Sequence, residues 1–572
     1  MKDFFDKINS KVIVIGILYV IFAVCAVIYL PKLMVLKPQS MTGETSQVMQ
    51  AYTSSGLGTG FAKIMQLLLA VVFIIIPFIA MGNLKDGTKK KKYGDQGSSE
   101  IKTYSELAEY CTSNSNPKKG DIGFVLSKNV RLKASKSYEH VCILGPTGAG
   151  KSTSFFIPCL LEADGTHSFV VTDPKGELCA KCGPYLQKQG VRVVKLEPLE
   201  PKKNKYYYNP LLVAEDTTQI RELAQMILIN GAKAVELSSG SSGGGSQSEW
   251  INMAVPLFVS ALIYFREFGV RKSINEAIDF ILTEDDMGKM EQTFSKSKQA
   301  VNNFRIFKTS GGSEKTISSI KSVLTSNIQL FLDDKIEEFT KTPFIMDART
   351  GGLIVDKTKL FDPKMLREKP TALFVCVPET KSDYMSPLMS VFYSQLLNNT
   401  MNYFDSNYPT PVLYMLDEFA NIGIIPGISK LAATCRSRKM GISVGIQSVE
   451  QLSRNYGEQD SHVLLDNLKA KVIYSGLVGE SAKYVSDLTG FTTVETTNYS
   501  KNSGQGQGIE ALFGSTSKST NGTRRETMTP DEIRRLDKEK VLIILDNKQP
   551  VIDVKNSYYL YNKYKQRVTE PK

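Results

Sequence analysis

Two long uncharged stretches stand near the start of the chain. Residues 12–31 (VIVIGILYVIFAVCAVIYLP) and 64–84 (IMQLLLAVVFIIIPFIAMGNL) contain no Asp, Glu, Lys or Arg. Because a helix of about 20 residues crosses a hydrocarbon core of roughly 30 Å, each stretch predicts a transmembrane helix. A cleaved signal peptide is the alternative for the first stretch, but its apolar run exceeds the usual length of about 7–15 residues and no small-residue cleavage site follows it.

Lysines flank the two predicted helices on their outer sides. Three precede the first helix, and five follow the second before residue 93. Since positively charged flanks stay in the cytoplasm, both chain termini are expected there, with residues 32–63 as a short external loop. The pattern therefore predicts a multi-pass anchor in the cell membrane over residues 1–92, followed by a polar linker over residues 93–119.

From residue 120 onward, short apolar runs alternate with segments of helical periodicity. The first three runs, EHVCILG (139–145), SFVVTD (168–173) and VRVVKL (191–196), have the length and composition of buried parallel strands. A predicted helix separates each run from the next. This βαβ order indicates an α/β fold whose first part covers residues 120–214.

The strand pattern stops between residues 215 and 345. Helical periodicity continues there without an obvious buried strand, as in WINMAVPLFVSALIYFREF (250–268). An inserted all-α domain is therefore predicted over residues 215–345. The Gly and Ser residues of SSGSSGGGSQS (238–248) predict a mobile loop ahead of residue 250.

Strand-like runs return in the C-terminal part, residues 346–572. Four apolar runs continue the α/β sheet, and two further runs near the end predict a closing hairpin. The stretch 496–523, rich in Ser, Thr, Asn and Gly, predicts a low-complexity loop. The predicted strands are ALFVCV (372–377), VLYMLDE (412–418), ISVGIQ (442–447), KVIYSG (471–476) and the hairpin VLIILDNKQPVIDV (541–554).

Composition indicates a large globular part with reduced thiols. Hydrophobic residues make up 42% of the 572 residues and charged residues 22%, which excludes disorder throughout the chain. The net charge of +12 suits contact with phosphate or anionic lipid, and equally ordinary solubility and membrane topology. Eight Cys residues form no disulfide framework, and the single CxxC pair, Cys179 and Cys182, lacks the second pair that a zinc site needs.

A glycine-rich loop follows the first buried strand. GPTGAGKS (145–152) fits GxxxxGK[ST] between a predicted strand and a predicted helix, the context that this phosphate-binding motif requires. Small residues let successive backbone N–H groups surround phosphate oxygens, and the helix N-terminus adds attraction. Lys151 is expected to reach the β- and γ-phosphates and Ser152 to hold Mg²⁺. The predicted nucleotide-binding residues are Gly145, Pro146, Thr147, Gly148, Ala149, Gly150, Lys151, Ser152 and Thr153.

Two carboxylates end the predicted strand VLYMLDE. Asp417 is expected to help Ser152 position Mg²⁺, and Glu418 to act as the general base that polarises an attacking water. Taken alone, the two acids could instead cap a helix at Asn421; together with the glycine-rich loop they indicate hydrolysis of a nucleotide. Because the chain shows no NKxD-type signal for guanine, ATP is the expected nucleotide.

Polar groups around the next predicted strand extend the candidate site. Gln447 ends ISVGIQ, where its amide could contact both the γ-phosphate and the attacking water and sense whether the phosphate is present. Just upstream, Arg436 and Arg438 either serve a neighbouring subunit as an arginine finger or belong to an exposed basic turn. On physical grounds alone DPKGEL (173–178) is a turn and a helix start, because Pro and Gly bend the chain and Glu favours a helix N-terminus.

Several motifs together resemble those of the type IV secretion coupling proteins, the TraG-like conjugal-transfer ATPases. The resemblance covers most of the chain, and the combination of DPKGEL with LDEFANIG is specific to this group rather than to P-loop proteins in general. Its motif residues in DPKGEL are Asp173, Pro174, Lys175, Gly176 and Glu177. The other matching segments are the two N-terminal spans, GPTGAGKS from 145, NPL from 209, the helical insertion near 250, LDEFANIG from 416, GISVGIQSVEQLSRNYG from 441, SDLTG from 486 and RRETMTPDEIRRL from 524.

The resemblance implies a RecA-like ATPase that uses ATP and Mg²⁺ and forms a homo-hexamer at the cell membrane. It further implies delivery of a relaxase bound to single-stranded DNA to the channel subunits of a type IV secretion system, with the helical insertion recognising DNA or relaxosome proteins. Two other functions stay open. One is a receptor that sorts protein substrates to a secretion channel with nucleotide as an assembly switch; the other is a chromosome-partition translocase of the FtsK type, which leaves DPKGEL and the helical insertion unexplained.

Overall fold

The computed structural model describes residues 64, 97–112, 117–239, 246–501 and 516–568. Both predicted transmembrane stretches lie outside these residues, apart from Ile64. Among the helices that the structure describes, one is long and apolar enough to cross a membrane, Ser248–Phe268, and most of it is buried inside the protein. The chain divides into two units, Met1–Gly94 and Asp95–Lys572, and the second contains a nine-stranded sheet.

This sheet has the strand order β15-β14-β11-β3-β10-β9-β4-β8-β5. Seven of its strands, from β11 to β5, run parallel, and the hairpin of β14 and β15 adds two antiparallel strands at one edge. Each strand coincides with an apolar run predicted from the sequence. Their bounds are β3 Val141–Leu144, β4 Ser168–Thr172, β5 Arg192–Leu196, β8 Thr371–Val375, β9 Val412–Leu416, β10 Met440–Ile446, β11 Ala470–Ile473, β14 Lys540–Leu545 and β15 Val551–Val554.

Helices cover both faces of the sheet, which is why the parallel strands are apolar throughout. In β3, for example, Val141 and Ile143 face one layer, whereas Cys142 and Leu144 face the other. One face packs against η2 (Tyr104–Tyr110), η3 (Ser152–Phe156), α6 (Ile157–Leu161), α7 (Glu177–Lys188) and α23 (Asn562–Lys565). The opposite face packs against α17 (Ser382–Asn402), α18 (Ile428–Thr434), α19 (Val449–Tyr456), α20 (Glu458–Asn467) and α21 (Gly479–Thr489).

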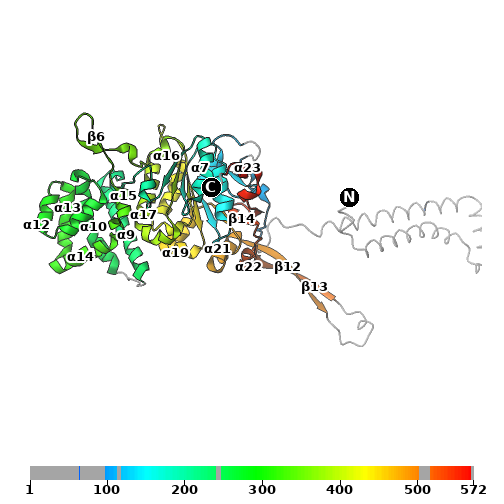
Figure 1. The fold of residues 1–572 in the computed structure, drawn as a ribbon. Coiled ribbons are helices and arrows are strands. Elements are labelled where there is room, and N and C mark those ends of the chain that lie inside the picture. Colours follow the sequence, from blue (N-terminus) through cyan, green and yellow to red (C-terminus); the bar gives the residue numbers. More distant parts are fainter. Residues whose placement is uncertain (1–63, 65–96, 113–116, 240–245, 502–515, 569–572) are drawn as a thin grey trace, which may run out of the picture. The chain divides into compact units, whose positions relative to one another are not determined.

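Between β5 and β8 the chain forms a bundle of helices, drawn in green in Figure 1. Polar side chains fix where several of these helices begin: Ser273, Ser297 and Ser313 each accept a hydrogen bond from a backbone N–H of the first helical turn. The predicted loop 238–248 is shorter than expected, because helices enter it from both ends, and its residues 240–245 lie outside the described part. The helices are α9 Thr217–Ser239, α10 Ser246–Phe268, α11 Ile274–Thr283, α12 Met287–Phe294, α13 Lys298–Gly311, α14 Glu314–Asn327 and α15 Asp334–Thr340.

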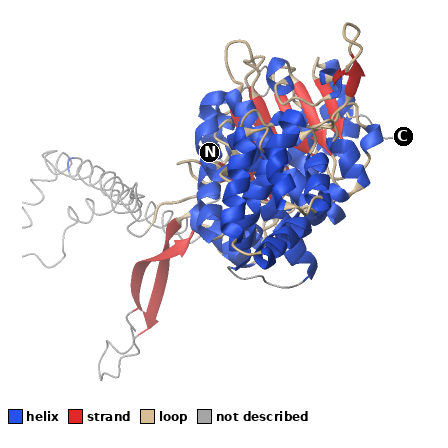
Figure 2. Ribbon diagram, turned by 90° about the vertical axis from the view of Figure 1, so that its left-hand side faces the viewer, coloured by secondary structure: helices blue, strands red, loops and turns tan. Residues whose placement is uncertain are grey.

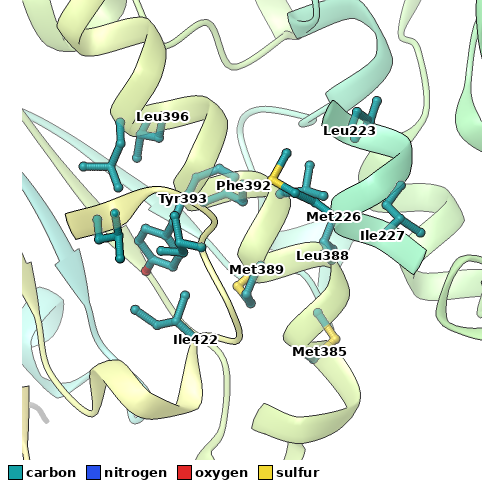
Figure 3. Close-up of a cluster of buried hydrophobic side chains, with 14 of the residues drawn as sticks. Leu223, Met226, Ile227, Met385, Leu388, Met389, Phe392, Tyr393, Leu396 and Ile422 are labelled. Atoms are coloured by element: carbon teal, nitrogen blue, oxygen red, sulfur yellow. The ribbon is translucent and has the colours of Figure 1, made fainter. Parts of the chain in front are cut away.

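The helical bundle and the sheet share one hydrophobic core. Figure 3 shows Leu223, Met226 and Ile227 of α9 facing Leu388 and neighbouring side chains of α17, which itself covers the sheet. Such a continuous apolar contact favours movement of the bundle together with the helix layer of the sheet, since separating them would expose buried side chains to water.

The prediction of a low-complexity loop over residues 496–523 is wrong for residues 496–501 and 516–523, whereas residues 502–515 lie outside the described part of the chain. Strands β12 (Phe491–Lys501) and β13 (Thr516–Glu526) pair antiparallel from Phe491↔Glu526 to Lys501↔Thr516, and the hairpin projects from the body of the unit (Figure 2). Thr is abundant in both strands, and its branched side chain suits extended backbone. Because both strands are mostly polar in sequence, the hydrophobic pattern of the chain did not indicate this strand pair.

The prediction of a linker over residues 93–119 is wrong for residues 97–112. Isolated bridges join Ser98 to Thr492, Lys102 to Val551 and Cys111 to Leu132, and Leu107 of η2 is fully buried. This segment is therefore docked on the second unit. The prediction failed because Ser98 and Lys102 pair with residues 394 and 449 positions away, which leave no local signal in the composition of the segment. Two small sheets complete the fold, β1 (Ile122–Val125) with β2 (Arg131–Lys133) and β6 (Phe344–Met346) with β7 (Leu353–Val355).

Candidate active site

The glycine-rich loop connects β3 to η3 at the carboxyl ends of the parallel strands. Gly148 and Gly150 have φ angles of +76° and +93°, a backbone conformation that side-chain-bearing residues rarely adopt. At Gly145 an added Cβ would lie 2.7 Å from Cβ of Tyr474, so the loop can approach β11 only without a side chain there. The sequence thus folds into a tight backbone cradle of the kind that binds phosphate groups.

Lys151 ends this loop with its side chain almost completely buried. Its Nζ donates a hydrogen bond to the carbonyl oxygen of Gly145 at 2.9 Å and lies 3.4 Å from Oε1 of Glu418. The structure therefore brings together two residues that are 267 positions apart in the sequence. An ammonium held across the mouth of a phosphate-binding loop can neutralise the charge of a bound phosphate.

Asp417 and Ser152 meet between the ends of β9 and β3. Ser152 Oγ donates to Asp417 Oδ2 at 3.2 Å, and the backbone N–H of Glu418 donates to Asp417 Oδ1 at 3.0 Å. Burial raises the pKa of Asp417 from its ordinary value of 3.8 to about 6, although Lys151 acts in the opposite direction. A serine hydroxyl beside a carboxylate is the hard oxygen set that Mg²⁺ prefers, so these residues fit the expected ion.

Glu418 has a left-handed backbone conformation with φ of +50°. This conformation is uncommon for a residue with a side chain, and such strain occurs most often at functional sites. Gln447 Nε2 donates to Glu418 Oε2 at 2.8 Å, while Lys151 lies near the other carboxylate oxygen. Because β10 runs between β3 and β9, the ends of three neighbouring strands bring Lys151, Glu418 and Gln447 to one place.

DPKGEL forms the turn between β4 and α7. Asp173 is buried and accepts hydrogen bonds from the N–H groups of Leu178 (3.1 Å) and Cys179 (2.8 Å), so its carboxylate caps the first turn of α7. Burial raises its pKa from the ordinary value. Pro174 lines a small cavity together with Asp417 and Glu418, so the motif borders the carboxylate pair. The remaining members, Lys175, Gly176 and Glu177, turn the chain at its surface.

Arg436 and Arg438 lie apart from the site within this chain. Both belong to η9 (Cys435–Arg438), which precedes β10, whereas the glycine-rich loop lies beyond the opposite ends of the parallel strands. Both side chains are exposed, and Arg436 pairs with Glu139 at 2.8 Å. Neither arginine can therefore act on the nucleotide site of its own chain.

Three residues that the sequence did not single out contact the site. Thr172 Oγ1 donates to the carbonyl oxygen of Asp417 at 2.9 Å, and the hydroxyl of Tyr474 lies 2.9 Å from Ser154 Oγ behind the loop. Lys555 Nζ donates to the carbonyl oxygen of Ala149 at 2.8 Å. Thr172 and Tyr474 stand at the ends of predicted strands and Lys555 directly follows one, so a strand end was the usable signal for all three.

Comparison with protein families and curated proteins gives consistent matches. The family model described as Type IV secretory system Conjugative DNA transfer matches residues 110–572. The chain is 25% identical over 427 residues to Protein VirD4 of Rhizobium rhizogenes, an alignment that covers 73% of this chain and 58% of the relative. It is 24% identical over 422 residues to Conjugal transfer protein TraG of Escherichia coli, with 70% and 62% covered. The chain thus spans less than two thirds of the length of these relatives.

Solved structures share the fold. The plasmid coupling protein TrwB in complex with ADP and Mg²⁺ matches with a TM-score of 0.56 and 15% identity, over 80% of this chain and 93% of TrwB. The unbound form of TrwB without its first 70 residues matches with a TM-score of 0.56 and 16% identity, over 80% and 92% of the two chains. At this identity the likeness establishes the α/β fold, as predicted.

Proposed function

The chain belongs to the type IV secretory system conjugative DNA transfer family, and on that premise we propose that it is a membrane-anchored ATPase coupling protein. In this proposal it recruits a relaxase bound to single-stranded DNA to a type IV secretion channel and drives the transfer by hydrolysing ATP. The membership confirms the resemblance to type IV coupling proteins that the sequence motifs carry. The single observation that supports hydrolysis best is the convergence of Lys151, Glu418 and Gln447 at the mouth of the glycine-rich loop.

Each residue of the site has a distinct task in this proposal. Mg²⁺, when bound, stabilises the negative charge that develops on the transferred phosphoryl group, and Ser152 and Asp417 are the residues that would hold it. Lys151 neutralises charge on the β- and γ-phosphates. Glu418 orients the attacking water and accepts its proton, and the hydrogen bond from Gln447 fixes the direction of the Glu418 carboxylate.

In this proposal the chain assembles into a homo-hexamer, and Arg436 or Arg438 contacts the nucleotide site of a neighbouring copy as an arginine finger. The exposed position of their turn, away from the site of its own chain, is compatible with this role. TrwB has been solved with analogues of both ATP and GTP, so the preference for ATP is part of the proposal. The predicted spans 12–31 and 64–84 would hold the ring at the cell membrane with both termini in the cytoplasm.

One observation favours the alternative that the helical bundle recognises protein rather than DNA. Residues 215–345 contain 17 acidic and 14 basic residues, although the whole chain carries a net charge of +12. A surface that binds nucleic acid through its phosphates needs an excess of positive charge. We therefore propose that this bundle contacts the relaxase or another protein substrate, and that any DNA contact lies elsewhere in the ring.

The deciding experiment measures ATP hydrolysis by the full chain, reconstituted in lipid nanodiscs, with and without single-stranded DNA at low and high salt. Stimulation that falls as salt rises supports DNA transfer through a basic channel. Hydrolysis that ignores DNA but responds to a relaxase supports the protein-sorting receptor. Absence of hydrolysis under all conditions would contradict the proposed ATPase, and repeating the assay with GTP tests the choice of nucleotide.

A further inference from the structure

A second lysine reaches the glycine-rich loop from the C-terminal end of the sheet. Lys555 directly follows β15, and its Nζ donates to the carbonyl oxygen of Ala149 at 2.8 Å. Its side chain also lies over the ring of Tyr474, with Nζ 5.0 Å from the ring centroid. Lys555 is only 7% exposed, so its side chain is largely shielded from water where the ammonium donates to this backbone carbonyl.

No ion pair explains the position of this ammonium in the part of the chain that the structure describes. Asp537 and Glu539 act on Lys555 through longer-range attraction, and burial lowers its pKa below the ordinary value. Burying a cation without a paired carboxylate is unfavourable. The unpaired ammonium of Lys555 instead contacts a backbone carbonyl of the phosphate-binding loop.

The backbone around Lys555 is held firmly in place. Its own N–H donates to the carbonyl oxygen of Glu539 at 2.9 Å. The next residue, Asn556, donates to the hydroxyl of Tyr564 at 2.8 Å, and that hydroxyl donates to the buried carboxylate of Glu162 at 2.7 Å. This network ties the C-terminal segment to the end of α6, the helix that continues from the glycine-rich loop. The C-terminal segment that carries Lys555 is thus attached to α6, the helix that follows the glycine-rich loop.

Peptide geometry links this contact to phosphate binding. The peptide unit between Ala149 and Gly150 is planar and trans, so the Ala149 carbonyl and the Gly150 N–H point in opposite directions. The Lys555 ammonium holds the Ala149 carbonyl oxygen toward itself, and the N–H of Gly150 therefore points away from Lys555. Hydrogen bonding at the carbonyl also polarises the peptide and strengthens its N–H as a donor.

We propose that Lys555 is a positioning residue of the nucleotide site, which holds the Ala149–Gly150 peptide in the orientation that binds the phosphates of a nucleoside di- or triphosphate. The inference rests on the proposed nucleotide-binding function. It makes phosphate affinity depend on docking of the C-terminal segment, because that segment carries the lysine. Lys151 and Lys555 then act differently: the first contacts phosphate, and the second orients the loop from behind.

The test compares Mg²⁺-dependent binding of ADP and kinetics of ATP hydrolysis in the full chain for the wild type and three variants. Lys555→Met keeps most of the apolar stem, and we expect it to weaken ADP binding and raise KM for ATP by about 10-fold, the usual loss for a charge-assisted hydrogen bond. The value of kcat at saturation should change by less than about 2-fold, because the reacting groups are untouched. Lys555→Arg should restore most of the affinity.

Lys565→Met is the matched control, because Lys565 lies in α23 of the same C-terminal segment and its side chain is exposed. It should bind ADP like the wild type. Equal affinities of Lys555→Met and the wild type would overturn the inference, and so would a loss of affinity that Lys565→Met reproduces or that accompanies a lowered melting temperature of the nucleotide-free protein. A wild-type chain that binds no nucleotide would instead overturn the proposed function itself, and the positioning role with it.

Discussion

The side chain of Asn230 in α9 forms two hydrogen bonds with the backbone of Ile424. Its Oδ1 accepts the N–H of Ile424 at 2.7 Å, and its Nδ2 donates to the carbonyl oxygen of Ile424 at 3.1 Å. Ile424 lies six residues after Glu418, and the loop between them includes Gly423, where an added Cβ would lie 2.9 Å from Asn230 Oδ1. This contact joins the helical bundle to the loop that carries the candidate general base, and we expect it to couple their movements.

The first prediction concerns coupling through Asn230. Asn230→Ala should leave nucleotide binding intact, because Asn230 does not touch the glycine-rich loop, but should remove most of the stimulation of ATP hydrolysis by DNA or relaxase. It should also lower the free energy of unfolding by about 1–3 kcal/mol, since two partly buried backbone groups of Ile424 lose a partner. Asn303→Ala is the control, because Asn303 is equally buried in the bundle but lies away from Ile424. Full stimulation in Asn230→Ala would contradict the coupling.

The second prediction separates chemistry from binding. Glu418→Gln should reduce kcat by about 10²–10⁴-fold, the usual contribution of a general base, while ADP and ATP still bind. Lys151→Ala should weaken nucleotide binding itself, because it removes the ammonium that neutralises phosphate charge. Steady-state kinetics and equilibrium binding measure the two effects, and Glu480→Gln on the exposed surface of α21 is the control. Hydrolysis at the wild-type rate by Glu418→Gln would remove Glu418 from the catalytic role.

The parallel sheet and its chemical groups could be predicted from the sequence because both signals are local. Buried parallel strands are apolar along their whole length, and residues such as Asp417 and Gln447 directly follow such runs. The contacts of Lys555 and Asn230 could not be predicted from local patterns. The first joins residues 406 positions apart, and the second joins residues 194 positions apart. The β12–β13 hairpin was missed for another reason: its strands pair through their backbones and are largely polar, so hydrophobic periodicity does not mark them.

The third prediction concerns the effect of pH on Asp417. Burial raises its pKa from 3.8 to about 6 in the folded protein, so the folded state binds its proton more tightly than the unfolded state does. The contribution of Asp417 to stability is therefore present at low pH and is lost as pH rises between about 3.8 and 6. In the absence of Mg²⁺ and nucleotide, Asp417→Asn should be more stable than the wild type at pH 7.5, by about 1–3 kcal/mol.

Thermal unfolding of the wild type and Asp417→Asn at pH 5 and pH 7.5 measures this effect. The difference between the two proteins should shrink toward pH 5, because the wild-type carboxyl group then carries its proton. Mg²⁺ with ADP should raise the melting temperature of the wild type more than that of Asp417→Asn, since the ion is held by the carboxylate. A stability difference that does not depend on pH would contradict the raised pKa.

The last prediction concerns whether Arg436 acts on a neighbouring chain. Its turn lies beyond the amino end of β10 and the glycine-rich loop beyond the carboxyl end of β3, so Arg436 can act on a nucleotide only if a ring brings the turn of one copy to the loop of the next. Arg436→Ala should lower kcat by about 10³-fold, as expected when an arginine finger is removed, without weakening nucleotide binding. Mixing this variant with Glu418→Gln should restore part of the activity, because some interfaces then join an intact Glu418 to an intact Arg436. If the mixture stays as inactive as its components, Arg436 does not act between subunits, and the same experiment with Arg438→Ala decides whether the neighbouring arginine does.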